Sequence, residues 1–252
     1  MDAAAGVRIF GLPGIPEVHP GDDLPGMIAA AARDAGGLQA NDVVVVTQKV
    51  VSKAEGRIVD LATVTPAAFA EQVAATWEKD ARQVEVVLGE SKRIVRMGHG
   101  VMICETHHGF ICANAGVDAS NVEQTGTVCL LPVDSDASAA GIRDRLVAAF
   151  GVPVAVIVSD SFGRPWREGI VNFAIGCAGM APLLDYTGQH DPAGYELRVT
   201  AMAVVDELAA AAELVHGKLA RMPVAVIRGA EYTRGEGTIR ALIRDAERDL
   251  FR

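Results

Sequence analysis

The chain has 252 residues, enough for one large domain or two modest ones with a substantial core. Half of the residues are hydrophobic and only 5 % are aromatic, a globular composition that leans toward α/β. The formal net charge of −9 at pH 7 argues against a general nucleic-acid surface, which needs a basic face.

The four cysteines are widely spaced and form no CxxC pair, which favours buried free thiols in a reducing compartment. No apolar run reaches the ~18–20 residues that a membrane helix requires. The amino terminus also lacks a basic-then-apolar signal pattern. We therefore expect a cytoplasmic protein with no membrane partner and no nucleic-acid partner.

The first part of the chain predicts strands and helices in alternation. A strand over residues 7–10 runs into a turn rich in glycine and proline. Asp22 and Asp23 begin a helix that two glycines at residues 36–37 end. Four consecutive valines at residues 43–46 then predict a buried strand, which passes into a polar loop.

The middle of the chain predicts a helical segment followed by short strands. Thr65 and Pro66 are a typical helix start, and the helical pattern continues past a break near Asp80. Glycine and histidine turns separate the next strands, which predicts an antiparallel meander over residues 93–97, 101–105 and 109–113. A polar loop at residues 114–124 and a strand at residues 127–132 follow.

The last part of the chain centres on an apolar, β-branched run that begins at Val152 and suits a strand buried on both faces. A polar segment, Ser159 to Glu168, follows at once, and we interpret it as a loop. Helical patterns are predicted on both sides of this strand, at residues 135–150, 197–216 and 238–250. We expect the second helix to be the longest, with Asp206 and Glu207 on its solvent face.

This order of elements predicts an α/β fold, or mixed α+β, with a mixed sheet, an antiparallel meander and flanking helices. The sequence shows no internal repeat, no low-complexity tract and no linker. Residues 1–252 are therefore expected to form a single domain, with room for two lobes.

Three polar segments follow apolar strands, at residues 48–57, 114–124 and 159–168. Ligands of α/β sheets gather beyond the carboxyl ends of strands. Carboxylate and hydroxyl oxygens suit Mg²⁺ or Mn²⁺, with phosphate and water completing the shell. Lys53 would act as a point charge on phosphate, and Arg164 would grip a carboxylate or phosphate, so we predict catalytic roles for both. The plain alternative is three loops of solvated charge.

Familiar motifs are missing. The chain has no GxxxxGK[ST], and neither of its two GxG segments has a third glycine three residues on. His107 and His108 are adjacent, so on a strand they would point to opposite faces, and a metal-ligand role is expected in roughly one case in ten. No Ser-His-Asp order has a nucleophile-elbow context.

Four segments, however, resemble the coenzyme F420-0:L-glutamate ligases, also called F420 gamma-glutamyl ligases. They are VSKAEGR at residues 51–57, NAGVDASN at 114–121, SDSFGRPWREG at 159–169 and PVAVIRG at 223–229. The resemblance runs from GLPGI at Gly11 to GEG at Gly235. That family extends a deazaflavin coenzyme with γ-linked glutamates, and some members carry a carboxyl-terminal nitroreductase-like domain, which we do not expect here.

The resemblance implies a metal-dependent amide ligase with a family-specific fold, usually a homodimer. It implies L-glutamate and the deazaflavin F420-0 as substrates, GTP as co-substrate, two Mn²⁺ or Mg²⁺ ions per site, and K⁺ as an open option. Matched positions place the divalent ions on Asp118, Asp160 and Ser161. They place the nucleotide on Leu12, Pro13, Gly14, Ile15, Gln48, Lys53, Asn121, Gly217, Lys218 and Leu219.

Two positions depart from the family pattern. Lys218 stands where a smaller or uncharged metal contact is expected, and Gln48 stands where relatives often have serine. These departures leave the second metal ion and part of the nucleotide site open.

The implied mechanism explains why no nucleophile is evident. Transfer of the γ-phosphoryl group of GTP to a carboxylate gives an acyl phosphate, which the amine of glutamate attacks with release of phosphate. Two alternatives stay open. One is another metal-dependent, nucleotide-using ligase or phosphotransferase on a different carboxylate, and the other is a non-catalytic deazaflavin- or nucleotide-binding module.

Overall fold

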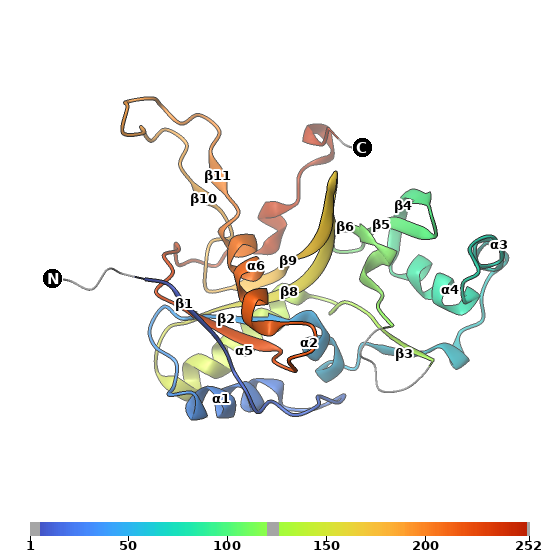
Figure 1. Ribbon diagram of the computed structural model, residues 1–252, viewed down its shortest axis with the longest axis horizontal. Coiled ribbons are helices and arrows are strands. Elements are labelled where there is room, and N and C mark those ends of the chain that lie inside the picture. Colours follow the sequence, from blue (N-terminus) through green and yellow to red (C-terminus); the bar gives the residue numbers. More distant parts are fainter. Residues whose placement is uncertain (1–5, 120–125, 251–252) are drawn as a thin grey trace.

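A mixed five-stranded sheet forms the centre of the molecule in the computed structural model, which describes residues 6–119 and 126–250 (Figure 1). The strand order is β1-β12-β2-β8-β9, and only β2 and β8 are parallel. The strands are β1 (Arg8–Gly11), β12 (Val224–Arg228), β2 (Val43–Thr47), β8 (Ala155–Arg164) and β9 (Arg167–Ala178). The predicted mixed sheet is confirmed.

Helices cover both faces of this sheet (Figure 1). Helix α5 (Ser135–Phe150) packs on β8 and β9, and α1 (Leu24–Asp34) packs on α5. Helix α6 (Val204–His216) lies on the opposite face, against β9, β1 and β12. Residues 43–46 of β2, 155–158 of β8 and 224–227 of β12 are runs of valine, isoleucine and alanine without solvent exposure, as expected of strands covered on both sides.

A smaller unit is inserted in the chain between β2 and β8, with a hydrophobic cluster separate from the one under the main sheet. Its strands form the predicted antiparallel meander, which is confirmed. The elements are α3 (Ala68–Trp77), α4 (Ala81–Gly89), β4 (Ser91–Gly98), β5 (Val101–Thr106) and β6 (Ile111–Ala113). A two-stranded ribbon of β3 (Ile58–Asp60) and β7 (Thr127–Cys129) lies beside them.

The remaining elements are short. A second ribbon pairs β10 (Leu184–Asp185) with β11 (Ala201–Met202) and projects from the body (Figure 1). Single 3₁₀ turns are η1 (Leu61–Thr63), η2 (Asn114–Gly116), η3 (Ile239–Leu242) and η4 (Ala246–Arg248). Within the described ranges, no helix combines the length and the apolar character needed to cross a membrane.

Two predicted loops are regular structure. Residues 48–54 form helix α2 (Gln48–Ala54), which begins directly after β2. The segment from Ser159 continues β8 to Arg164, turns at Pro165 and Trp166, and returns as β9. Pairing with β9 supplies partners for the backbone groups of this polar segment, so it stays extended despite its composition.

Three predictions about the carboxyl-terminal part are wrong. Helix α6 begins at Val204 rather than at residue 197, and with 13 residues it is shorter than α5, which has 16. Asp206 is not a solvent-face residue, because its Oδ1 accepts a hydrogen bond of 2.9 Å from the backbone N–H of Ala174. The expected last helix is only the two turns η3 and η4.

Candidate active site

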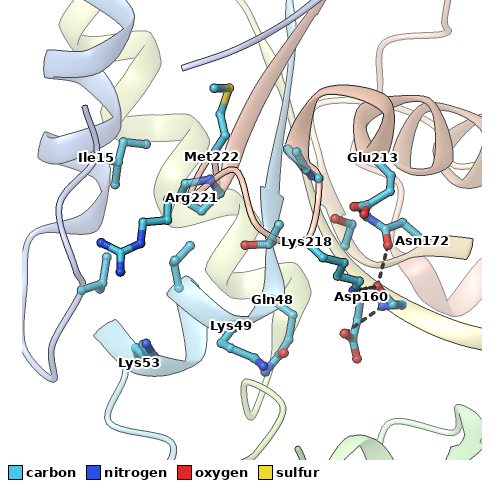
Figure 2. A pocket seen from close by; sticks show the side chains of 18 of the residues that line it. Ile15, Gln48, Lys49, Lys53, Asp160, Asn172, Glu213, Lys218, Arg221 and Met222 are labelled. Carbon is cyan, nitrogen blue, oxygen red and sulfur yellow. Dashed lines mark hydrogen bonds between the residues drawn. The ribbon is translucent and has the colours of Figure 1, made fainter. Parts of the chain in front are cut away.

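A cavity of about 940 Å³ lies where β2 and β8 end, beneath the loop that joins α6 to β12 (Figure 2). Because β2 and β8 are parallel, their carboxyl ends meet at this edge of the sheet. Figure 2 shows Lys49 and Lys53 projecting from α2, and Lys218 and Arg221 from the α6–β12 loop. The polar lining includes Glu17, Gln48, Lys49, Lys53, Asp118, Asp160, Ser161, Asn172, Glu213, His216, Lys218 and Arg221.

The three residues predicted as metal ligands all line this cavity. Asp160 and Ser161 lie on β8, and Asp118 is held by a bridge in which Asp118 and Cys129 exchange backbone hydrogen bonds of 3.0 and 2.8 Å. Burial raises the pKa of Asp160 to about 6, and the negative charge of Asp118 adds to the rise. The two carboxyl groups are therefore close enough to interact.

Lysine side chains surround these oxygens. Lys49 Nζ lies 2.6 Å from Asp118 Oδ2, and Lys218 Nζ donates to Ser161 Oγ over 2.8 Å. Lys53, nearly buried, pairs with Glu17 at the cavity wall. Lys49 and Lys53 are four residues apart, so helix α2 presents both on one face.

A hydrogen-bonded chain supports the hydroxyl of Ser161. Ser161 Oγ lies 2.7 Å from Asn172 Oδ1 on the facing strand β9, where the two residues are register partners. Asn172 Nδ2 in turn donates to Glu213 Oε2 on α6, over 3.0 Å. Sequence reasoning missed Asn172 and Glu213, because nothing in their local sequence indicates that they face Ser161.

His216 ends helix α6 and lines the same cavity. Its side chain is buried, and burial lowers its pKa, so the ring is neutral at pH 7. The charge of Lys218 also lowers this pKa, whereas Glu213 and the backbone of Val45 oppose the shift.

The predicted nucleotide residues divide into two groups. Ile15, Gln48, Lys53, Gly217, Lys218 and Leu219 line the cavity, whereas Leu12, Pro13 and Gly14 are not among its described lining residues. Leu12 is fully buried, and its N–H donates to the carbonyl of Val224. Asn121 lies outside the described residues.

Gln48 and Arg164 have partners within the protein. Gln48 is buried, and its Nε2 donates to Ser52 Oγ over 2.6 Å and to the carbonyl of Leu130 over 3.0 Å. Arg164 Nη2 donates to the carbonyl of Glu168 across the hairpin turn, over 2.6 Å, and Arg164 is not among the described residues that line the cavity. A catalytic role for Arg164 stays a prediction that this geometry does not support.

The donor set suits a hard divalent cation. Among residues 6–119 and 126–250, no three His, Cys, Asp or Glu side chains gather as a metal cluster. The predicted ligands are the two carboxylates of Asp118 and Asp160 and the hydroxyl of Ser161. These oxygens fit an ion such as Mg²⁺, which keeps several water or phosphate ligands. A carboxylate that is costly to ionise when buried also gains from a nearby cation.

The cavity lies at the carboxyl ends of parallel strands, which is where α/β enzymes bind their ligands. The comparisons with known proteins identify the family. The family model described as F420-0:Gamma-glutamyl ligase matches residues 14–229. The chain belongs to this family of ligases, which confirms the resemblance inferred from its segments.

Curated relatives match along nearly the whole chain. The coenzyme F420:L-glutamate ligase of Methanothermobacter thermautotrophicus is 43% identical over 251 residues, which cover 98% of this chain and 99% of the relative. The enzyme of the same name from Methanopyrus kandleri is 45% identical, with 98% of both chains covered. That of Methanocaldococcus jannaschii is 42% identical over 216 residues, 85% of this chain and 86% of the relative.

Proposed function

We propose that this protein is a GTP-dependent ligase that joins L-glutamate to the deazaflavin F420-0, and then adds further γ-linked glutamates. The observation that carries the proposal is the convergence of Asp118, Asp160 and Ser161 with three lysines around one cavity. The names of the relatives, which are F420:L-glutamate ligases, supply the acceptor and the amino acid.

The chemistry needs positioning and charge neutralisation more than a protein nucleophile. A carboxylate oxygen of the acceptor attacks the γ-phosphorus of GTP, the bond to the β-phosphate oxygen breaks, and GDP leaves. The glutamate amine then attacks the acyl carbon, phosphate leaves with the C–O bond electrons, and the amine loses a proton. An amide, GDP and phosphate result.

The cavity supplies positive charge on two sides. Lys53 on α2 lines the cavity and would contact a phosphate as a point charge, in exchange for its pairing with Glu17. Arg221, on the α6–β12 loop, brings a second cation from the other side (Figure 2). Asp118 and Asp160 would hold Mg²⁺ or Mn²⁺, and Ser161 would join them where Lys218 is displaced from its hydroxyl; the ion neutralises phosphate charge when bound.

The test is a ligation assay with purified protein, F420-0, L-glutamate, GTP and Mn²⁺. We expect a product heavier by one glutamyl residue in the mass spectrum, with GDP formed in equal amount. ATP in place of GTP should give much less product. Lys53→Met should raise the KM for GTP, since a charge contact to phosphate is removed.

Two other outcomes would replace the proposal. Turnover of GTP only with another carboxylate acceptor would show a related ligase or phosphotransferase. Binding of F420-0 or GTP without any turnover would show a non-catalytic binding module. The carboxylates of Asp118 and Asp160 argue against this last case, because a module that only binds anions gains nothing from them.

A further inference from the structure

We propose that the ammonium group of Lys218 takes the place of one metal ion in this site, as a resident cation. The site with bound nucleotide then holds one divalent cation rather than two. The inference rests on the proposed function only in assuming that the cavity binds GTP with a metal ion. The observation behind it is the contact of Lys218 with Ser161, one of the three oxygen ligands available to a metal.

The hydrogen-bonded chain fixes how the Ser161 hydroxyl is used. Glu213 is a carboxylate that accepts hydrogen bonds, so the NH₂ group of Asn172 must face it. The amide oxygen of Asn172 therefore faces Ser161 and accepts the single hydroxyl proton. Ser161 Oγ is left as an acceptor, and Lys218 donates to it over 2.8 Å.

A second metal ion on Ser161 would meet this ammonium group. With a metal–oxygen bond of about 2.1 Å, an ion on the remaining lone pair of Oγ would lie about 4 Å from Lys218 Nζ. Repulsion between +2 and +1 charges at that separation disfavours the ion strongly, even at the edge of a solvated cavity. Ser161 can serve a metal only if Lys218 withdraws.

The two lysines that contact the predicted metal ligands match the two carboxylates among those ligands in charge. Asp118 and Asp160 contribute two negative charges when ionised, and Lys49, on Asp118, and Lys218, on Ser161, contribute two positive charges. With these charges balanced, a single divalent cation is enough to offset part of the negative charge on the phosphates of GTP.

The experiment counts metal ions rather than turnover. Mn²⁺ is titrated into the full chain with a GTP analogue that carries an imido group between the β- and γ-phosphorus, and free Mn²⁺ is read by its electron paramagnetic resonance signal. We expect one bound ion per chain in the wild type and two in Lys218→Met, which keeps the side-chain length without the charge. Lys218 lies on an exposed loop, so the variant leaves the core intact.

Two matched variants separate this role from a general effect of charge. Lys218→Arg keeps the positive charge and should bind one ion. Lys53→Met removes a different cavity lysine, which pairs with Glu17 rather than with Ser161, and should also bind one ion. Two ions in the wild type, or one ion in Lys218→Met, would overturn the proposal.

A titration with Mn²⁺ alone tests the same point without any nucleotide. Because a charged hydrogen-bond donor no longer competes for Ser161, Lys218→Met should bind Mn²⁺ roughly tenfold more tightly than the wild type. Equal affinities would count against a resident cation. Failure of the ligation assay would refute the proposed function and leave these metal counts as they stand.

Discussion

Asp160→Asn should stabilise the folded protein and abolish ligation at the same time. The substitution removes the charge of a buried carboxylate but keeps an oxygen that can accept the 2.8 Å hydrogen bond from the backbone N–H of Ser161. Ligation should fall to background, because one of the two carboxylates predicted to hold the metal ion is lost.

The size of the stability gain follows from the raised pKa. Below pH 3.8, Asp160 is protonated in both the folded and the unfolded chain, and folding carries no ionisation cost. As the pH rises from 3.8 through about 6, the unfolded chain loses this proton first, so the folded state is progressively destabilised. The full difference between the pKa of Asp160 in the unfolded and in the folded chain corresponds to about 3 kcal/mol in the free energy of unfolding. Because part of the Asp160 side chain is exposed, we expect Asp160→Asn to gain about half of this free energy at pH 7.5.

Thermal unfolding in the presence of a chelator measures this gain. For a chain of this length, 1 kcal/mol shifts Tm by about 2–4 °C, so Asp160→Asn should raise Tm by roughly 3–6 °C at pH 7.5. The gain should vanish below pH 4. Asp245→Asn, at an exposed carboxylate outside the cavity, is the matched control and should leave Tm unchanged.

Two results would refute this reasoning. A lower Tm for Asp160→Asn in chelator would mean that the carboxylate stabilises the fold through contacts rather than destabilising it through burial. An equal Mn²⁺-dependent rise in Tm for wild type and variant would remove Asp160 from the metal site, since a ligand stabilises only the state that binds it.

Three further predictions concern the fold. Asp42→Asn should lower the free energy of unfolding by about 3 kcal/mol in urea, because the buried Asp42 accepts hydrogen bonds of 2.9 and 2.7 Å from Arg228; an unchanged midpoint would contradict this. Gly176→Ala should destabilise by more than about 2 kcal/mol, since its Cβ would lie 2.2 Å from a backbone oxygen of α5, whereas Gly141→Ala on α5 meets nothing and should stabilise slightly. The contribution of His216 to the free energy of unfolding should fall as the pH drops below 6.5, the ordinary pKa of histidine, because His216 is buried neutral and only the unfolded chain gains the proton. This contribution is opposite in sign to that of Asp160, so it is read as the difference between the wild type and His216→Gln. The wild type should lose more stability than His216→Gln between pH 7.5 and 6, and equal losses would exclude this role.

Buried strands were the part of the fold that the sequence predicted well. Residues 43–46 of β2 and 155–158 of β8 are apolar at every position, a pattern typical of strands covered on both faces. Polar segments were predicted poorly, because their composition does not reveal a tertiary partner. Residues 159–164 are extended through pairing with β9, and residues 48–54 are helical although the side chain of Thr47 at the N-cap makes no capping hydrogen bond.

The candidate site was predictable where it lies at a strand end. Asp118, Asp160 and Ser161 could be placed together from the ends of strands and from the family resemblance. Lys49 would have followed from its spacing of four to Lys53, had the segment been recognised as a helix. The hydrogen-bonded support of Ser161 could not be predicted, because it depends on the exact pairing of β8 with β9 and on which face α6 presents.

The presence of two separate hydrophobic clusters has a consequence for catalysis. Asp160 is anchored to the cluster beneath the main sheet, and Asp118 follows Val117, which belongs to the cluster of the smaller unit. A cation bound by both carboxylates would link the main sheet to the smaller unit. Separation of the smaller unit from the main sheet would then move the two carboxylates apart and stop catalysis while the central sheet stayed folded. Bound metal should slow cleavage by proteases where the two parts meet.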